Sequence, residues 1–187
     1  LAFSSLGLGQ WFIRALLTVQ DKVELVYQFF KIQLIVGCFF YLFNILIAFA
    51  LYKNPVIRNL ALLIGINLIF DNIIYVIKYV NIAEFNQKRT FVILTVEALL
   101  KFLAAGALLF ITISIVQLAA LLILLRFITL HLFLKFGSVY PLGLDKIAGI
   151  PLNRLQFKNI VIANWTFVVI GSISVIYWKV GTILISK

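Results

Sequence analysis

The sequence has few of the residues that build metal centres and covalent cross-links, because its 187 residues include no methionine, one cysteine and one histidine. The single cysteine, Cys38, excludes an intramolecular disulfide. A zinc or haem centre usually draws on several Cys, His or carboxylate ligands, and His131 is the only histidine. We therefore predict neither a metal nor any other cofactor, and we expect Cys38 and His131 to be packing or contact residues.

Charged residues are also scarce, at 12% of the chain against about 25% in a typical soluble domain. The 16 basic residues outnumber the 6 acidic ones, but they are scattered at the ends of apolar runs. This distribution argues against a nucleic-acid partner and predicts contacts with membrane lipids, including anionic lipids. The sequence contains no Gly-rich phosphate loop, nucleophile elbow, CxxC or HExxH motif, so we do not expect an enzyme.

Apolar residues make up 64% of the chain, and its mean hydropathy is +1.16. A soluble domain carries about 45–50% apolar residues. We therefore predict an all-α integral membrane protein with a single transmembrane domain over residues 1–187. High contents of Phe, Ile, Asn, Lys and Tyr fit an AT-rich genome, which suggests an organellar inner membrane, such as the mitochondrial one, or a bacterial inner membrane.

Four apolar runs predict a bundle of about four transmembrane helices, over residues 32–52, 56–77, 102–125 and 159–178. The connection between the first two is short, and Pro55 suits the first turn of the second helix, so these helices should form an antiparallel hairpin. The last span ends in Trp178 and Lys179, which are typical of a membrane interface, as is Trp11 near the other end. Basic residues flank both sides about equally and give no orientation.

The third run lies within residues 91–136, which contain no Gly-Pro, Asn-Gly or similar turn signal. We predict one continuous helix that projects beyond the bilayer. Glu97 and Lys101, four residues apart, would form an ion pair on its surface just outside the membrane. The alternative is two spans with a tight break near Gly106 or Gln117, which would give five spans in all.

Two further segments flank the spans. Residues 10–30 place apolar side chains at helical spacing between charged ones, which predicts an amphipathic helix at the membrane interface, anchored by Trp11. A helix packed on a neighbouring subunit fits the same pattern. Residues 137–154 gather prolines and glycines and form the longest irregular connection, which we interpret as a docking loop.

Polar residues inside the predicted spans, or directly at the end of one, are the candidate functional residues: Asn44, Asn67, Asp71 and Lys78. We interpret Asn44 as a hydrogen-bonding contact between helices. A carboxylate within a span costs about 3 kcal/mol or more to insert, so Asp71 is the most informative residue. We expect Asp71 to pair with Lys78, or with a cation of another subunit, in a structural ion pair. The alternative is an ion or proton path that Asp71 lines with Asn67 and Asn44.

These features together predict a non-catalytic, multi-pass subunit of a larger membrane complex, with other membrane protein subunits as partners. The predicted long helix and the interfacial segments would add docking surface. The alternative is a small ion or proton channel or a secondary transporter, using Asp71 and functioning as an oligomer.

Overall fold

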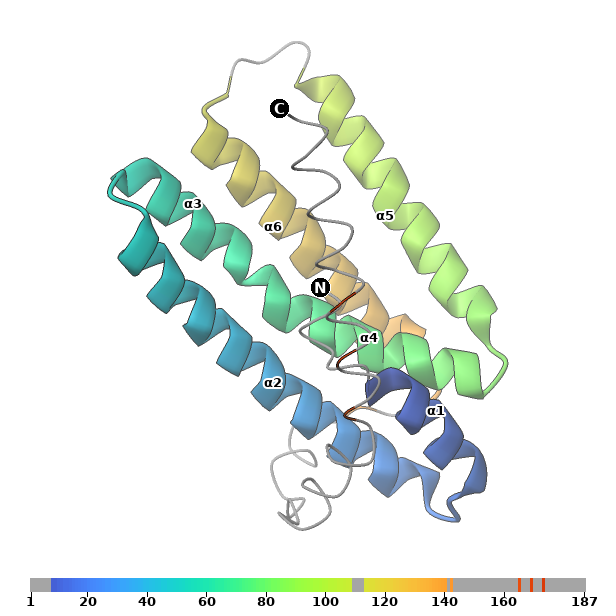
Figure 1. Cartoon of the computed structure of the whole chain (residues 1–187). Helices are drawn as coiled ribbons and strands as arrows, with labels where there is room; N and C mark the ends of the chain where they lie inside the picture. Colours follow the sequence, from blue (N-terminus) through green and yellow to red (C-terminus); the bar gives the residue numbers. More distant parts are fainter. Residues whose placement is uncertain are drawn as a thin grey trace.

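A computed structural model describes residues 8–108, 113–140 and 142, together with the three helical positions 165, 169 and 173. Every regular element in these residues is helical, which confirms the all-α part of the predicted fold class (Figure 1). The elements are α1 (Leu8–Thr18), α2 (Lys22–Leu51), α3 (Pro55–Gly65), α4 (Asn67–Ala83), α5 (Gln87–Ala107), α6 (Ile115–Leu132) and the π-helical turn η1 (Phe133–Gly137).

Four stretches of this part of the chain are long and apolar enough to cross a membrane: Lys22–Leu51, Pro55–Ala83, Gln87–Ala107 and Ile115–Gly137. They run alongside one another in alternating directions (Figure 1). Helix α4 is central, because it contacts α1, α2, α5, α6 and η1. Polar side chains of α4 can therefore meet partners from several other described helices.

The predicted hairpin of the first two spans is confirmed. Helix α2 ends at Leu51 and α3 begins at Pro55, where Asn54 caps it by accepting a hydrogen bond from the Val56 amide at 2.9 Å. The second span runs further than predicted and bends at Ile66, which separates α3 from α4. The α3 and α4 helices together reach Ala83, so Lys78 lies well inside this stretch.

The prediction of one interfacial helix over residues 10–30 is wrong. Helix α1 ends at Thr18, and Asp21 caps α2 by accepting a hydrogen bond from the Glu24 amide at 3.0 Å. Residues 22–31, which include the charged Lys22, Glu24 and Lys31, thus form the beginning of the first long helix, α2. Helix α1 buries its apolar face inside the bundle, and Phe12 stacks on Phe29 with ring centroids 4.0 Å apart. The apolar side chains of α1 pack against other helices of this chain. An amphipathic pattern alone does not distinguish such packing from contact with lipid.

The prediction of one span over residues 102–125, within a continuous helix over 91–136, is also wrong. Helix α5 ends at Ala107 and α6 begins at Ile115. Ser114 and Gln117 form a capping box: the Ser114 Oγ accepts from the Gln117 amide, and the Gln117 side chain accepts from the Ser114 amide. At ~1.5 Å per residue the 21 residues of α5 already extend about 32 Å, so one helix fills a bilayer core without projecting. The broken arrangement is the one considered as the alternative.

Two predicted segments fall mostly outside the described residues. These are the span over 159–178, with Trp178 and Lys179, and the loop over 137–154, of which the structure describes residues 137–140 and 142. Trp11 is described and packs partly buried against the apolar core, with its ring centroid 6.5 Å from that of Phe29. Its role as an interface anchor stays a prediction.

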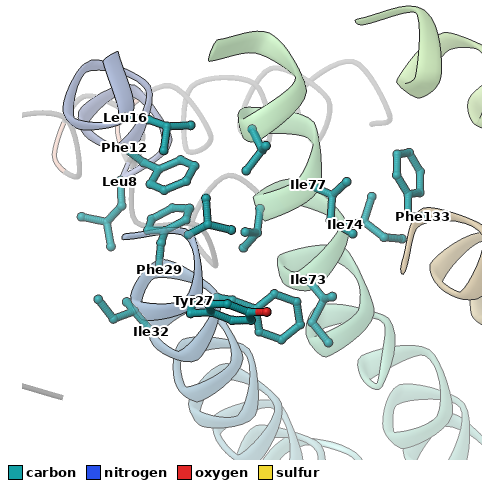
Figure 2. Packing of buried hydrophobic residues seen from close by; sticks show 14 of the residues in the cluster. Leu8, Phe12, Leu16, Tyr27, Phe29, Ile32, Ile73, Ile74, Ile77 and Phe133 are labelled. Carbon is teal, nitrogen blue, oxygen red and sulfur yellow. The ribbon is translucent and has the colours of Figure 1, made fainter. Parts of the chain in front are cut away.

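The apolar core occupies one half of the bundle, the half that ends at the turn between α4 and α5 (Figure 2). Helix α1, the first half of α2, α4 from Ile73 onwards and η1 supply most of it, with Ile93 from α5 and Leu130 from α6. Its fully buried members include Phe12, Phe29, Phe30, Ile74, Ile77 and Phe133. Towards the other end the described helices bury little. Helix α2 buries only Ala48 beyond Gly37, α3 buries only Gly65, and α5 buries nothing after Glu97.

Candidate functional site

Three charged side chains meet at the middle of the bundle, each from a different helix. Glu97 lies midway between residues 87 and 107, and Arg126 lies midway between residues 115 and 137. Asp71 lies two residues past residue 69, the midpoint of 55–83. The three helices bring these residues together although 55 positions separate Asp71 from Arg126 along the chain. A charge at this depth is costly in a membrane, so its presence points to a specific role.

Arg126 holds both carboxylates. Its Nε donates to the Asp71 Oδ1 at 2.6 Å, and one terminal nitrogen donates to the same oxygen. The other terminal nitrogen donates to both oxygens of Glu97, at 2.9 and 3.1 Å. Both carboxylates are buried, and the Arg126 side chain is 19% exposed. A guanidinium suits this position because its planar fork satisfies two acceptors at once.

Lys101 completes the cluster. Its ammonium donates to the Glu97 Oε1 at 2.6 Å, which confirms the predicted i,i+4 ion pair. Glu97 is buried at mid-helix, so the pair does not lie on the helix surface as predicted; its position just outside the membrane stays a prediction. The charged cluster, defined as Asp71, Glu97, Lys101 and Arg126, carries two positive and two negative groups. It is therefore neutral overall, which lowers the cost of burial.

Lys78, the partner that we expected for Asp71, does not take that role. Within the part of the chain that the structure describes, Asp71 pairs with Arg126, while the Lys78 ammonium lies 5.4 Å from the centroid of the Tyr75 ring. Arg126 directly follows the predicted span over residues 102–125 and was therefore not among the candidate residues. The signal that could have identified it is its position inside the run formed by residues 115–134, once the helix is broken at Ser114.

The two asparagines have different surroundings. The Asn44 amide donates to the Ala61 carbonyl at 2.9 Å and packs where Gly65 leaves room, so Asn44 joins α2 to α3. Its predicted role as an interhelical contact is confirmed. Asn67 lies one turn before Asp71, and its Oδ1 is buried without a hydrogen-bond partner among the described residues. Asn44 lies on the α2–α3 hairpin and Asn67 beside the cluster, so they are separate features.

An open pocket of about 320 Å³ adjoins the charged cluster. It is lined by Asn67, Asp71, Lys101, Leu122 and Arg126. Lys101 is half exposed, with 48% of its side chain accessible, so the cluster has a buried side and a side that meets the pocket. The pocket thus gives a small polar molecule a route to charges at the middle of the bundle.

A second polar group, formed by Lys22, Glu84 and Tyr140, joins the start of α2 to the end of α4 and to the segment after η1. The Lys22 ammonium and the Tyr140 hydroxyl both donate to the Glu84 Oε1, at 2.9 and 2.7 Å. The bond from Lys22, followed by that from Tyr140, lowers the pKa of Glu84. Desolvation and the neighbouring carboxylate raise the pKa of Tyr140 to about 12. Beside this group, the buried Asn81 amide donates to Thr90 and to the Gly137 carbonyl, both at 2.9 Å.

Another open pocket, of about 360 Å³, lies near the same end. It combines basic and amide groups with an apolar wall, and is lined by Asn86, Lys88, Arg89, Val92, Ile93 and Phe136. Arg89 also donates to the Ser138 carbonyl at 2.8 Å. Two cations beside apolar side chains at the end of a long apolar helix suit the head group and upper acyl chain of an anionic lipid.

Metal-ligating residues do not gather anywhere in the described residues, where no group of three His, Cys, Asp or Glu side chains has the geometry to hold an ion. His131 is exposed on α6. Comparison with known proteins gives no further assignment: no family model, curated protein or solved structure matches this chain.

Proposed function

We propose that this chain is an integral membrane protein that acts as a non-catalytic, multi-pass subunit of a larger membrane assembly. The observation that carries the proposal is how much apolar surface the described bundle leaves uncovered. In the most apolar 18-residue stretch of each of the four long helices, only a minority of the residues are buried: 17%, 39%, 11% and 22%, in chain order. A water-soluble bundle of this size would bury one apolar face of each helix and expose polar residues on the other.

Helix α2 illustrates the exposed surface. Large apolar side chains recur at alternating four- and three-residue spacing on its outer face: Ile35, Phe39, Leu42, Leu46 and Phe49, each of them exposed. Helix α5 buries only Ile93 and Glu97. Acyl chains and the helices of other subunits are the environments that favour such faces.

The charged cluster supports a structural role. Both mid-depth carboxylates have cationic partners within the described chain, and the cluster joins three helices that otherwise pack loosely at this level. Such a group fixes which helices meet and in what register. The pocket beside Lys88 and Arg89 supports the expected contact with anionic lipid. The location in an organellar or bacterial inner membrane remains a prediction.

The native cysteine tests membrane insertion without any substitution. Cys38 is exposed and lies near the middle of α2. In sealed membranes we expect Cys38 to react with a lipid-soluble maleimide and not with a membrane-impermeant, hydrophilic one. Reaction with the hydrophilic reagent from either side would overturn insertion of α2. Full reaction of the same sample with the hydrophilic reagent after denaturation in detergent is the control for thiol integrity.

Membership of an assembly needs a separate measurement. We expect native mass spectrometry of the protein, gently solubilised from its own membrane, to show it in complexes with other chains. A protein that travels only as a monomer or a homo-oligomer would contradict the subunit role. The labelling result and the mass are independent, so the two parts of the proposal fail separately.

A second candidate function is a small ion or proton channel or a secondary transporter. The observation that favours it is a pocket that reaches ionised groups at the middle of the bundle. Asp71→Asn separates the two candidates. A structural role predicts reduced yield of the complex, because Arg126 loses one of its two carboxylates. A transport role predicts normal yield and abolished flux in reconstituted vesicles. We expect the reduced yield.

A further inference from the structure

The pocket lies on one side of the charged cluster only. Asn67 precedes Asp71 by four residues, Lys101 follows Glu97 by four, and Leu122 precedes Arg126 by four. Helices α4 and α6 run opposite to α5 (Figure 1), so these three offsets all point to the same end of the bundle, where α5 connects to α6. Each offset is about 6 Å at ~1.5 Å per residue. Asp71 and Arg126 therefore form the floor of the pocket, and Asn67, Lys101 and Leu122 line it about one helical turn further towards that end.

The two halves of the bundle differ in packing on either side of that floor. We name the half between the cluster and the α4–α5 turn the packed half, and the other the open half. In the packed half, Ile74, Ile77, Val80, Ile93 and Phe133 are all buried and belong to the apolar core (Figure 2). From Asp71 to the end of α4, at ~1.5 Å per residue, this packing continues for about 18 Å.

The open half lacks an equivalent core in the described residues. Helices α5 and α6 bury only Ala119 and Leu125 on this side of Glu97 and Arg126. The pocket of about 320 Å³ has room for roughly ten water molecules, each of which occupies about 30 Å³ in the liquid. Two cations, a carboxylate and an amide line it, so water is a better occupant than an acyl chain.

Asn67 gives an independent indication. Its Oδ1 has no hydrogen-bond partner among the described residues, although the side chain lines the pocket. A buried amide oxygen without a partner costs about 1–3 kcal/mol. The last side-chain torsion of asparagine is soft, so a small rotation would bring this oxygen within reach of a water donor in the pocket.

We propose that the open half is a one-sided aqueous vestibule. Water and small hydrophilic solutes enter from the end where α5 connects to α6, reach Asp71, Lys101 and Arg126 at the middle of the bundle, and stop at the packed half. The inference rests on the proposed membrane insertion but not on the subunit role. It holds whether the cluster is structural or also takes part in transport.

Two neighbouring leucines of α6 provide a matched test. Leu122 lines the pocket and is 44% exposed, whereas Leu124 is 54% exposed and is not among the pocket residues. The experiment compares Leu122→Cys with Leu124→Cys, each in a Cys38→Ser background, in sealed native membranes. A membrane-impermeant thiol reagent is added to one side at a time, and a lipid-soluble maleimide is used in parallel.

We expect Leu122→Cys to be fully modified by the impermeant reagent from one side and unmodified from the other. Leu124→Cys should react only with the lipid-soluble reagent. Asn67→Cys, on the opposite wall, should behave like Leu122→Cys, and Ile77→Cys in the packed half should stay unmodified by the impermeant reagent. Circular dichroism and elution volume of each purified variant establish that it is folded.

Protection of Leu122→Cys and Asn67→Cys from the impermeant reagent, with Leu124→Cys still reacting with the lipid-soluble one, would overturn the vestibule and leave membrane insertion intact. Modification of both leucine positions by the impermeant reagent would overturn membrane insertion itself. Modification of Leu122→Cys in the isolated chain, but not in the native assembly, would mean that a partner subunit fills this space, and would also overturn the vestibule.

Discussion

Arg126 should be the most sensitive residue of the charged cluster, because it is the only one that contacts both buried carboxylates. Arg126→Met keeps the unbranched stem of the side chain as far as the position of Nε and removes the rest of the guanidinium, and with it the cation. Glu97 then retains Lys101 at 2.6 Å, but Asp71 is left without its partner. Removing one member of a buried ion pair costs roughly 3–5 kcal/mol, which is a large part of a typical unfolding free energy of 5–15 kcal/mol.

Asp71→Asn should cost less, about 1–3 kcal/mol, because Arg126 still donates two hydrogen bonds to Glu97. The double variant Asp71→Asn/Arg126→Met should be more stable than Arg126→Met alone, since no unpaired charge remains. The difference between the double variant and the sum of the single ones is expected to be about 0.5–3 kcal/mol, the usual range for residues in contact.

The unfolding free energy of each variant is measured in mixed micelles by titration with sodium dodecyl sulfate, followed by far-ultraviolet circular dichroism. Lys53→Gln, at an exposed position between α2 and α3, is the control and should change stability by less than about 0.5 kcal/mol. If Arg126→Met proved as stable as Lys53→Gln, or if the double variant were no better than Arg126→Met, the cluster would not hold the bundle together.

Three further predictions concern helix ends, glycines and pH. Ser114→Ala removes the capping box of α6 and should lower the unfolding free energy by about 1 kcal/mol, measured in the same titration. Gly9→Ala would overlap a tyrosine ring of α4 and should cost about 1–3 kcal/mol, whereas Gly106→Ala meets nothing within 4 Å and should gain about 0.5–1 kcal/mol. The lowered pKa of Glu84 predicts a stabilisation that is complete above its ordinary value of 4.5 and lost as the pH falls below it. The pKa of Tyr140, raised from 10.0 to about 12, predicts a stabilisation lost as the pH rises through that interval, and Tyr140→Phe should remove this alkaline loss from the pH profile of the unfolding midpoint.

The first hairpin was predictable because its signals are local. Asn54 and Pro55 end one helix and begin the next through their own backbone and side-chain preferences, which do not depend on the rest of the fold. Asn44 was predictable for a related reason, since an amide inside an apolar helix needs a partner and the neighbouring helix is the nearest source. The bend at Ile66 had no comparable signal.

The break between α5 and α6 had a signal that we did not use. The continuous helix was predicted from the lack of glycine and proline turns, but Ser114 and Gln117 have the spacing of a capping box in front of an apolar run. This spacing also occurs where no helix begins. It indicates a helix start here only because the length of an unbroken helix also favours a break. A helix over residues 91–136 would extend about 69 Å at ~1.5 Å per residue, which already favours a break.

The charged cluster could not be assembled from hydropathy, because hydropathy treats every charge in an apolar run as a border. The one span predicted over residues 102–125 therefore lay between Glu97 and Arg126, whereas each of these residues lies at the middle of its own candidate span. The inconsistency was visible at Asp71, since a carboxylate inside a span requires a cation at the same depth. Lys78 lies seven residues from Asp71 on the same helix, about 11 Å along the axis at ~1.5 Å per residue, and is therefore poorly placed to pair with it. A cation at the same depth as Asp71 but on another helix is Arg126. Arg126 reaches that depth only if the chain breaks between α5 and α6, and the same break places Glu97 at mid-helix beside it.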